Sequence, residues 1–115
     1  MWNILQTDEF GQWFEKLDIS SQTSIYEKMI VLKEFGPKLG RPYVDTVNNS
    51  IFKNMKELRV QSKNRPYRIL FAFDPNRNAV LLVGGNKAGK KRFYDEMIKQ
   101  ADELFTKYLE DINET

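Results

Sequence analysis

Charged side chains alternate with apolar ones in two short stretches near the middle of the chain, and these are the residues best suited to chemistry. In residues 56–61, the two-residue period of a strand places Glu57 and Arg59 on one face and the apolar residues on the other. Arg68 stands alone among the apolar residues of 67–73. If the two stretches pair as strands, the two arginines converge with Glu57 on one sheet face.

Two interpretations of these charges are open at this point. Glu57 with Arg59 is as consistent with an ordinary cross-strand ion pair, worth less than about 1 kcal/mol, as with a functional role. For Arg68 a functional role is favoured, because a lone charge in an apolar strand is costly unless it is paired or reaches a ligand.

The composition excludes several kinds of site. The chain has no Cys, which rules out disulfides and thiolate metal sites, and no His, the commonest side chain for proton transfer near neutral pH. Its acids do not cluster at a ligand spacing, so we expect no metal and no cofactor. RNA carries its own nucleophile in the 2′-hydroxyl, so Lys, Arg, Glu and Tyr suffice to cleave it.

The charge is unevenly distributed along the chain. Residues 53–92 hold eleven Lys and Arg against two acids, a net charge of +9, whereas the remainder has a net charge of −7. Clustered charge sets the local electrostatic field, so a cationic middle predicts a polyanionic partner. Nucleic acid is the partner expected first.

A glycine- and lysine-rich segment, residues 84–92, follows the last predicted strand. It lacks the spacing of a nucleotide-binding P-loop, and a solvated turn is the plain alternative. Its cations precede a helix, where they oppose the helix dipole, which favours a loop that contacts phosphate. These cations are Lys87, Lys90, Lys91 and Arg92. Tyr94, just beyond them, is a candidate to stack on a base or to act as an acid, or is simply part of the core.

The elements that must position these residues follow from hydrophobic periodicity. We predict an opening strand at 2–6 and then a first helix, which Thr7 or Asp8 caps and which carries Phe10, Trp13, Phe14 and Leu17 on one face. A second helix at 21–35 should end at Gly36 and Pro37. An irregular connection at 38–53 should follow, then strands at 56–61, 67–73 and 79–84 and a final helix at 91–109.

Together these elements predict one α+β domain over residues 1–115. The first two helices should form an antiparallel hairpin, and with the last helix they should pack on a small, mainly antiparallel sheet. The longest apolar runs are five residues, far below the roughly 20 that a membrane-spanning helix needs. We therefore expect no membrane association and a cytoplasmic protein.

The order of these motifs resembles the RelE/ParE superfamily of bacterial toxins, and most closely its HigB-like, phage-derived branch. The residues that carry the resemblance are Leu58-Arg59, the Tyr67-Arg68 strand and the segment 85–94. The resemblance implies a compact α+β fold and, for many members, cleavage of mRNA in the ribosomal A site. It also implies a helix-turn-helix antitoxin as the partner that holds the protein inactive.

Carried onto this chain, the resemblance implies catalytic roles for Arg68, Arg59 and Tyr94, with Glu57 or Lys56 as the base. RNA contacts are implied for Lys87, Lys90, Lys91, Arg92, Lys53 and Arg65. Two features depart from the family: Lys56 is followed by Glu57 instead of alternating with another lysine, and the histidine that several HigB-type members use is absent.

The leading hypothesis is therefore the toxin of a type II toxin–antitoxin pair, acting as a metal-independent, ribosome-dependent mRNA endonuclease. One alternative is a ParE-like inhibitor of DNA gyrase without nuclease activity. Another is a noncatalytic RNA-binding module, which would bind with strong salt dependence but would not arrest translation. For the antitoxin, the apolar helices are the expected docking surface.

Overall fold

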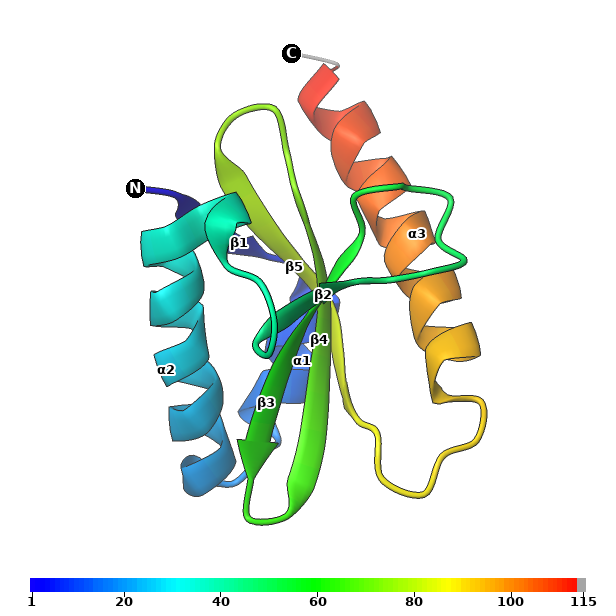
Figure 1. Cartoon of the computed structure of the whole chain (residues 1–115). Helices are drawn as coiled ribbons and strands as arrows, with labels where there is room; N and C mark the ends of the chain where they lie inside the picture. The colour runs from blue at the N-terminus through cyan, green and yellow to red at the C-terminus, as the bar shows by residue number, and fades with distance from the viewer. Residues whose placement is uncertain (114–115) are drawn as a thin grey trace.

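A computed structural model describes residues 1–113 of the chain (Figure 1). The elements, in order, are β1 (Asn3–Gln6), α1 (Asp8–Glu15), α2 (Ile19–Phe35), the short 3-10 helix η1 (Gly36–Lys38), β2 (Val44–Thr46), β3 (Lys56–Ser62), β4 (Arg65–Phe73), β5 (Asn78–Asn86) and α3 (Phe93–Asn113).

One five-stranded sheet forms the centre of the molecule, with strand order β1-β5-β4-β3-β2. The pairs β2–β3, β3–β4 and β4–β5 are antiparallel, and β1 joins the edge of β5 in parallel. A bulge interrupts the ladder between β4 and β5: Leu70 pairs with Val83 and Phe71 with Leu81, which leaves Leu82 as the extra residue. The predicted α+β class with a mainly antiparallel sheet is confirmed.

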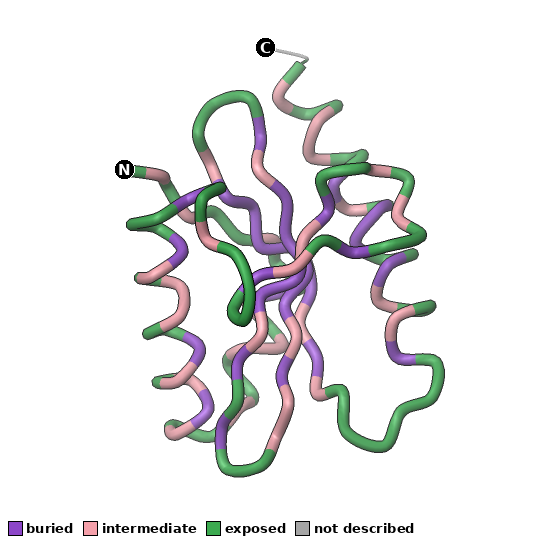
Figure 2. The backbone as a smooth tube through the Cα atoms, viewed as in Figure 1, coloured by how far each residue is buried: buried purple, intermediate pink, exposed green. Residues whose placement is uncertain are grey.

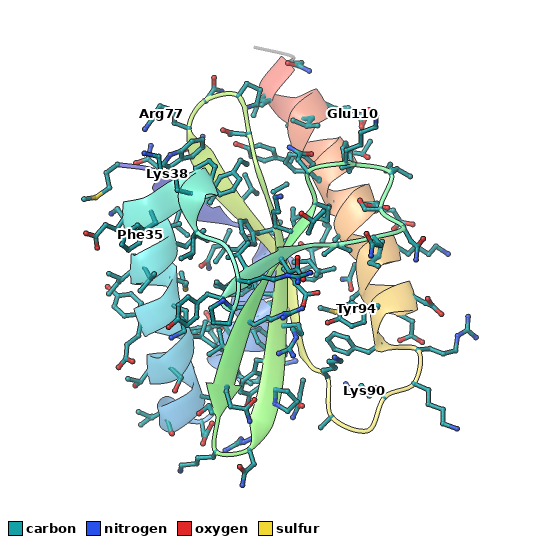
Figure 3. The ribbon with its side chains drawn as sticks, in the orientation of Figure 1. Phe35, Lys38, Arg77, Lys90, Tyr94 and Glu110 are labelled. Atoms are coloured by element: carbon teal, nitrogen blue, oxygen red, sulfur yellow. The ribbon has the colours of Figure 1, made fainter. Side chains whose placement is uncertain are left out.

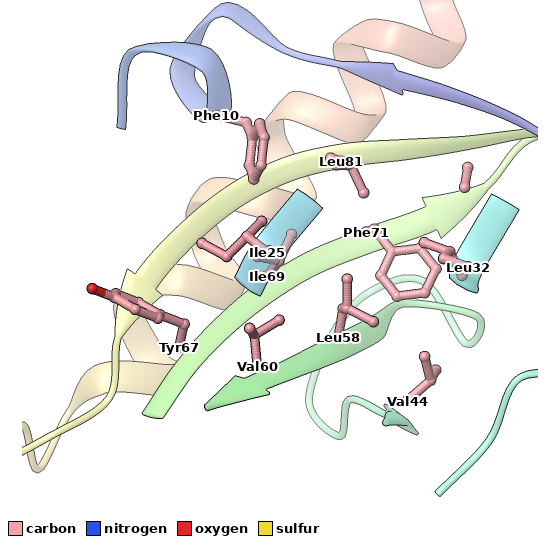
Figure 4. Close-up of a cluster of buried hydrophobic side chains, with 11 residues drawn as sticks. Phe10, Ile25, Leu32, Val44, Leu58, Val60, Tyr67, Ile69, Phe71 and Leu81 are labelled. Atoms are coloured by element: carbon pink, nitrogen blue, oxygen red, sulfur yellow. The ribbon is translucent and has the colours of Figure 1, made fainter. Parts of the chain in front are cut away.

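Helices cover both faces of the sheet, with α2 and α3 on opposite sides in Figure 1. One core lies under α1 and α2 and includes Phe10, Ile25, Leu58, Ile69 and Phe71 (Figure 4). A second core lies under α3 and includes Met55, Leu70, Leu82, Ala101 and Phe105. The buried positions therefore follow the centre of the sheet, as Figure 2 shows. Because both faces of β4 are covered, Arg68 in the middle of this strand has little space for its side chain.

Local side-chain chemistry explains where the first two helices begin and end. The Thr7 hydroxyl caps α1 by accepting a hydrogen bond from the Phe10 N–H at 3.0 Å, and the Asp18 carboxylate caps α2 by accepting from the Ser21 N–H at 3.3 Å. Gly36 ends α2 with a φ of 56°, and a Cβ at this position would clash with the Trp2 ring.

Several predicted boundaries are wrong by a few residues, and one strand was missed. α2 begins at Ile19 instead of 21, and α3 begins at Phe93 instead of 91, because residues 91 and 92 still belong to a turn. The stretch predicted as an irregular connection contains β2, a three-residue strand that pairs only with residues 56–58 of β3. No helix within residues 1–113 is both long enough and apolar enough to cross a membrane.

Candidate active site

The carboxylate of Glu57 is the centre of a cluster built from β3, β4 and α3. One of its oxygens, Oε1, accepts hydrogen bonds from Arg59 Nε at 3.0 Å and from the Tyr94 hydroxyl at 3.1 Å. Arg68 Nε lies 3.4 Å from the same oxygen. The Glu57 side chain is 6% exposed, so three donors surround an almost fully buried charge.

The strand register brings the two arginines together. Arg59 on β3 is directly opposite Arg68 on β4, and both side chains lie on the face that α3 covers. Two guanidinium groups in this position repel each other, and Glu57 compensates for that repulsion. Hydrogen bonding with Glu57, followed by its charge, raises the pKa of Arg59.

Arg68 is held differently from Arg59. One of its terminal nitrogens donates to the Tyr67 carbonyl at 2.9 Å. Its buried Nε–H lies close to Glu57 without the alignment of a hydrogen bond, so that contact is electrostatic. The sequence predicted that this lone charge in an apolar strand is either paired or reaches a ligand, and in the structure it lies against Glu57.

A second carboxylate, Asp45 on β2, holds Arg59 from the other side. Asp45 Oδ2 accepts from Arg59 at 3.2 Å and from Arg41 at 3.1 Å. The hydrogen bond from Arg41 is the main reason why the pKa of Asp45 is lowered. Asp45 was not predicted as a site residue because β2 was not predicted. The run Tyr-Val-Asp-Thr-Val at 43–47, rich in strand-forming residues, was the available signal.

Tyr94, in the first turn of α3, supplies the one phenol of the cluster (Figure 3). Burial, followed by the charge of Glu57, raises the pKa of Tyr94, and hydrogen bonding with Arg68, followed by its charge, only partly opposes this. The phenol therefore keeps its proton at neutral pH and remains a hydrogen-bond donor. Lys87 Nζ lies 5.4 Å from the centroid of the Tyr94 ring, which places a cation beside this donor.

These side chains border an open hollow of about 380 Å³ between β2, β3 and the start of α3. Glu57, Arg59, Lys87 and Tyr94 line it, together with Asn48 and Asn49 from the connection that follows β2. The hollow thus offers an anionic group a guanidinium, an ammonium and a phenol, and its lining also contains three carboxylates, those of Asp45, Glu57 and Asp95. Among residues 1–113, no group of three or more His, Cys, Asp or Glu side chains is arranged to hold a metal ion.

Not every predicted site residue joins this cluster. Lys56 lies on the opposite face of β3 from Glu57, where its ammonium donates to the Thr46 hydroxyl at 2.9 Å. Arg65 also faces away from Arg68, since it forms an ion pair with Asp18 at 3.1 Å. The remaining predicted RNA contacts, Lys53, Lys90, Lys91 and Arg92, are exposed, and Figure 3 shows Lys90 on the loop below α3.

Residues 12–106 of the chain match the family described as "Phage derived protein Gp49-like". Two proteins of Mycobacterium tuberculosis (strain ATCC 25618 / H37Rv), both named as candidate toxins, are similar to it. HigB2 is 47% identical over 110 residues, which are 94% of this chain and 55% of HigB2. HigB3 is 48% identical over 107 residues, which are 92% of each chain. The chain thus spans about half the length of HigB2 and nearly all of HigB3.

Solved structures with the same fold come from two organisms. The free state of a mutant of the E. coli toxin RelE superposes with a TM-score of 0.63 at 14% identity, covering 85% of this chain and 95% of RelE. RelE from the archaeal RelE–RelB complex of Pyrococcus horikoshii OT3 superposes with a TM-score of 0.58 at 11% identity. The match covers 77% of this chain and 98% of that RelE chain. At these identities the likeness concerns the fold.

Proposed function

Because this chain belongs to the Gp49-like family of phage-derived proteins, we propose that it is the toxin of a type II toxin–antitoxin pair and cleaves mRNA on the ribosome. The observation that carries the proposal is the cluster in which Arg59, Arg68 and Tyr94 converge on the Glu57 carboxylate. The similarity to HigB2 and HigB3 supports the toxin assignment.

In this proposal the scissile phosphate of the RNA binds to Arg59 and Arg68. Arg59 donates to Glu57 and Asp45, and Arg68 donates to the Tyr67 carbonyl, and each guanidinium group keeps further N–H groups for phosphate oxygens. Arg59 is the more accessible of the two, since its side chain is 38% exposed and that of Arg68 is 15% exposed. Arg59 therefore meets the phosphate first, and Arg68 stabilises the charge that develops on it.

The reaction is an attack by the neighbouring 2′-hydroxyl on phosphorus. Glu57 accepts the proton of that hydroxyl as the 2′-oxygen–phosphorus bond forms and the bond to the 5′-oxygen breaks. The products are a 2′,3′-cyclic phosphate and a free 5′-hydroxyl. The nucleophile belongs to the RNA, so the step requires only a base, an acid and cations. Of the two candidate bases, Glu57 fits this role better than Lys56, which lies on the other face of β3.

Tyr94 is the acid in this scheme. Its raised pKa keeps the phenol protonated, and its hydroxyl already lies 3.1 Å from the Glu57 oxygen that takes up a proton. The proton that Tyr94 gives to the leaving 5′-oxygen is restored from Glu57 through the same hydrogen bond. Lys87 beside the ring stabilises the phenolate that forms transiently.

The proposal extends to partners and location. The exposed cations Lys90, Lys91 and Arg92 beyond β5 are suited to ribosomal RNA, where contacts to the phosphate backbone dominate. A cognate helix-turn-helix antitoxin is the proposed inhibitor, and the cytoplasm is the proposed location. P. horikoshii RelE, which has this fold, was solved in complex with RelB, which supports an antitoxin partner.

Expression of Arg68→Ala in bacteria tests the proposal. Wild-type protein should arrest growth and produce new mRNA 5′ ends, and Arg68→Ala should do neither. Arg77→Ala is the matched control, because Arg77 lies in the hairpin turn at the far end of the sheet, over the Trp2 ring (Figure 3). Undiminished cleavage by Arg68→Ala would contradict the role given to this residue.

The same cultures separate this proposal from its alternatives. A gyrase inhibitor would alter plasmid supercoiling without creating new mRNA 5′ ends. A noncatalytic RNA-binding module would bind RNA with a steep dependence on salt but would leave translation running. Either result from the wild-type protein would overturn the proposed activity.

A further inference from the structure

A second groove, of about 350 Å³, lies on the other side of Arg59 from the hollow that contains Tyr94. Lys28 of α2 and Tyr43 of the following connection form one wall. Arg59, Gln61 and Arg68 of the sheet form the other. Arg59 therefore stands between two depressions and borders both, whereas Arg68 borders only the second groove.

The groove exists because β2 is short. β2 pairs with residues 56–58 of β3, and the Tyr43 carbonyl accepts one more hydrogen bond, from the Arg59 N–H at 2.8 Å. Past Arg59, the edge of β3 runs beside α2 without a neighbouring strand. This short open edge, with Gln61 on it, belongs to the wall of the groove that the sheet forms.

Tyr43 presents an aromatic ring at the rim of this groove. The residue is 41% exposed, although two hydrogen bonds fix its backbone. Its carbonyl accepts the bond from the Arg59 N–H described above, and its N–H donates to the Gly40 carbonyl at 3.1 Å. Lys28 Nζ lies 4.6 Å from the centroid of the ring. An exposed ring on a fixed backbone, next to cations, is the arrangement by which proteins stack unpaired RNA bases.

We propose that this groove binds the nucleotide adjacent to the scissile phosphate, with its base stacked on Tyr43. This inference rests on the proposed function. An RNA strand whose phosphate lies on Arg59 passes from one depression into the other, because that side chain lines both. Lys28 neutralises the next phosphate, and the Gln61 amide is in place to bond a base edge.

The charge of the groove favours RNA over a peptide strand added to the open edge of β3. Its lining contains three cations, Lys28, Arg59 and Arg68, and one acid, Glu27. The free edge past Arg59 is also only three residues long, which offers few backbone hydrogen bonds to a peptide.

A binding experiment tests the groove without depending on cleavage. The probe is a short single-stranded RNA in which every ribose carries a 2′-O-methyl group, so that the attacking hydroxyl is blocked. Its affinity is measured by NMR titration at low salt for the wild type and for Tyr43→Ala, Tyr43→Phe and Tyr26→Ala. Tyr26 is the matched control, since it is 59% exposed on α2 and does not line the groove.

Loss of one base–aromatic stack weakens binding by about five- to a hundredfold, so Tyr43→Ala should show a loss in that range. Tyr43→Phe should bind within about twofold of the wild type, because the ring remains, and Tyr26→Ala should match the wild type. Thermal unfolding of each variant establishes that all are folded. Wild-type affinity in folded Tyr43→Ala, or no binding of the RNA by the wild type, would overturn the subsite.

Mapping of mRNA 5′ ends in cells separates the two proposals. If Tyr43→Ala binds the probe normally while the wild type cleaves mRNA and Arg68→Ala does not, the subsite is wrong and the proposed function stands. If Tyr43→Ala loses affinity for the probe while the wild type cleaves no mRNA, the nucleotide subsite stands and the proposed cleavage fails.

Discussion

The hydroxyl of Tyr94 donates a hydrogen bond to the Glu57 carboxylate over 3.1 Å and so joins the first turn of α3 to β3. Together with the packing of Tyr94 against the core under α3, this bond fixes the phenol relative to the two arginines. The chemical scheme therefore depends on the packing of α3 as much as on the charges of the sheet.

Tyr94→Phe should separate catalysis from stability. Loss of the proton donor should lower the rate of mRNA cleavage by about 10²- to 10⁴-fold, the usual range for general acid catalysis. Loss of the hydrogen bond should lower the free energy of unfolding by about 1 kcal/mol. Single-turnover cleavage on programmed ribosomes and denaturant unfolding measure the two effects.

Tyr108→Phe is the matched control for that substitution. It also removes a tyrosine–carboxylate hydrogen bond, from Tyr108 to Asp74 at 2.6 Å, but at the far end of α3. It should cost similar stability and leave the cleavage rate within about twofold, since general acid catalysis requires a donor at the reacting oxygen. Equal cleavage by the two variants would remove Tyr94 from the mechanism.

Glu57→Gln should abolish cleavage and strengthen RNA binding at the same time. The amide keeps the shape of the side chain but cannot accept the proton of the 2′-hydroxyl, and it removes the negative charge that Arg59 and Arg68 share. We expect the rate to fall by about a hundredfold or more, the usual contribution of proton transfer to a base. Affinity for 2′-O-methyl RNA should rise, as filter binding would measure. Weaker binding by the folded variant would show that Glu57 organises the arginines for the RNA.

Lys87→Ala should weaken RNA binding without preference for sequence and lower the salt slope of binding by about 1, as expected for loss of one phosphate contact. Lys99→Ala, an exposed position on the outer side of α3, is the control and should leave the slope unchanged. Affinities measured across a series of salt concentrations give both slopes. An unchanged slope for Lys87→Ala would mean that this lysine does not contact phosphate.

Gly85→Ala should impair cleavage by displacing the start of α3. A Cβ at Gly85 would lie 2.8 Å from the Phe93 ring, next to Tyr94 in the chain, whereas a Cβ at Gly40 would meet no atom within 4 Å. We expect a loss of about 1 to 3 kcal/mol in stability from the overpacking, and at least a tenfold slower cleavage. Gly40→Ala should cause neither effect. Full activity in Gly85→Ala would show that the helix tolerates the shift.

The contact between Tyr108 and Asp74 predicts a loss of stability at alkaline pH. Burial, followed by the hydrogen bond to Asp74, raises the pKa of Tyr108 from 10.0 to about 12. The unfolded chain releases this proton near pH 10, whereas the folded protein retains it, so the stabilisation is complete below pH 10 and is lost as the pH rises toward 12. The loss should be roughly 1 to 2 kcal/mol after allowance for solvent screening. Urea unfolding of wild type and Tyr108→Phe at pH 9 to 12 measures it, and parallel pH profiles would contradict it.

Simple periodicity, once the two strands were taken to pair, was enough to predict that Arg59 and Arg68 converge with Glu57. The two-residue period of a strand put Glu57 and Arg59 on one face, and the antiparallel pairing then placed Arg68 opposite Arg59. The same period places Lys56 with Leu58 on the other face, so periodicity by itself puts the two candidate bases, Glu57 and Lys56, on opposite faces of the sheet. The resemblance to lysine-containing family strands obscured that distinction.

Other parts of the site depend on contacts between distant segments and have no local sequence signal. Asp45 reaches Arg59 only because three residues pair at the edge of β3. The groove beside Tyr43 forms because the pairing of β2 with β3 stops at Leu58. The start of α3 at Phe93 is likewise set by packing against Gly85, which local helix propensity does not report.

α3 is attached to the rest of the protein at three points along its length. Asp102 binds Ser50 and the backbone of Ile51, Tyr108 binds Asp74 in the hairpin turn, and Tyr94 binds Glu57 at the opposite end. With a rise of 1.5 Å per residue, Tyr108 and Tyr94 are separated by roughly 21 Å along the helix axis. Because the attachments are spread over this distance, loss of any one of them leaves the other two to hold the helix in register with the sheet.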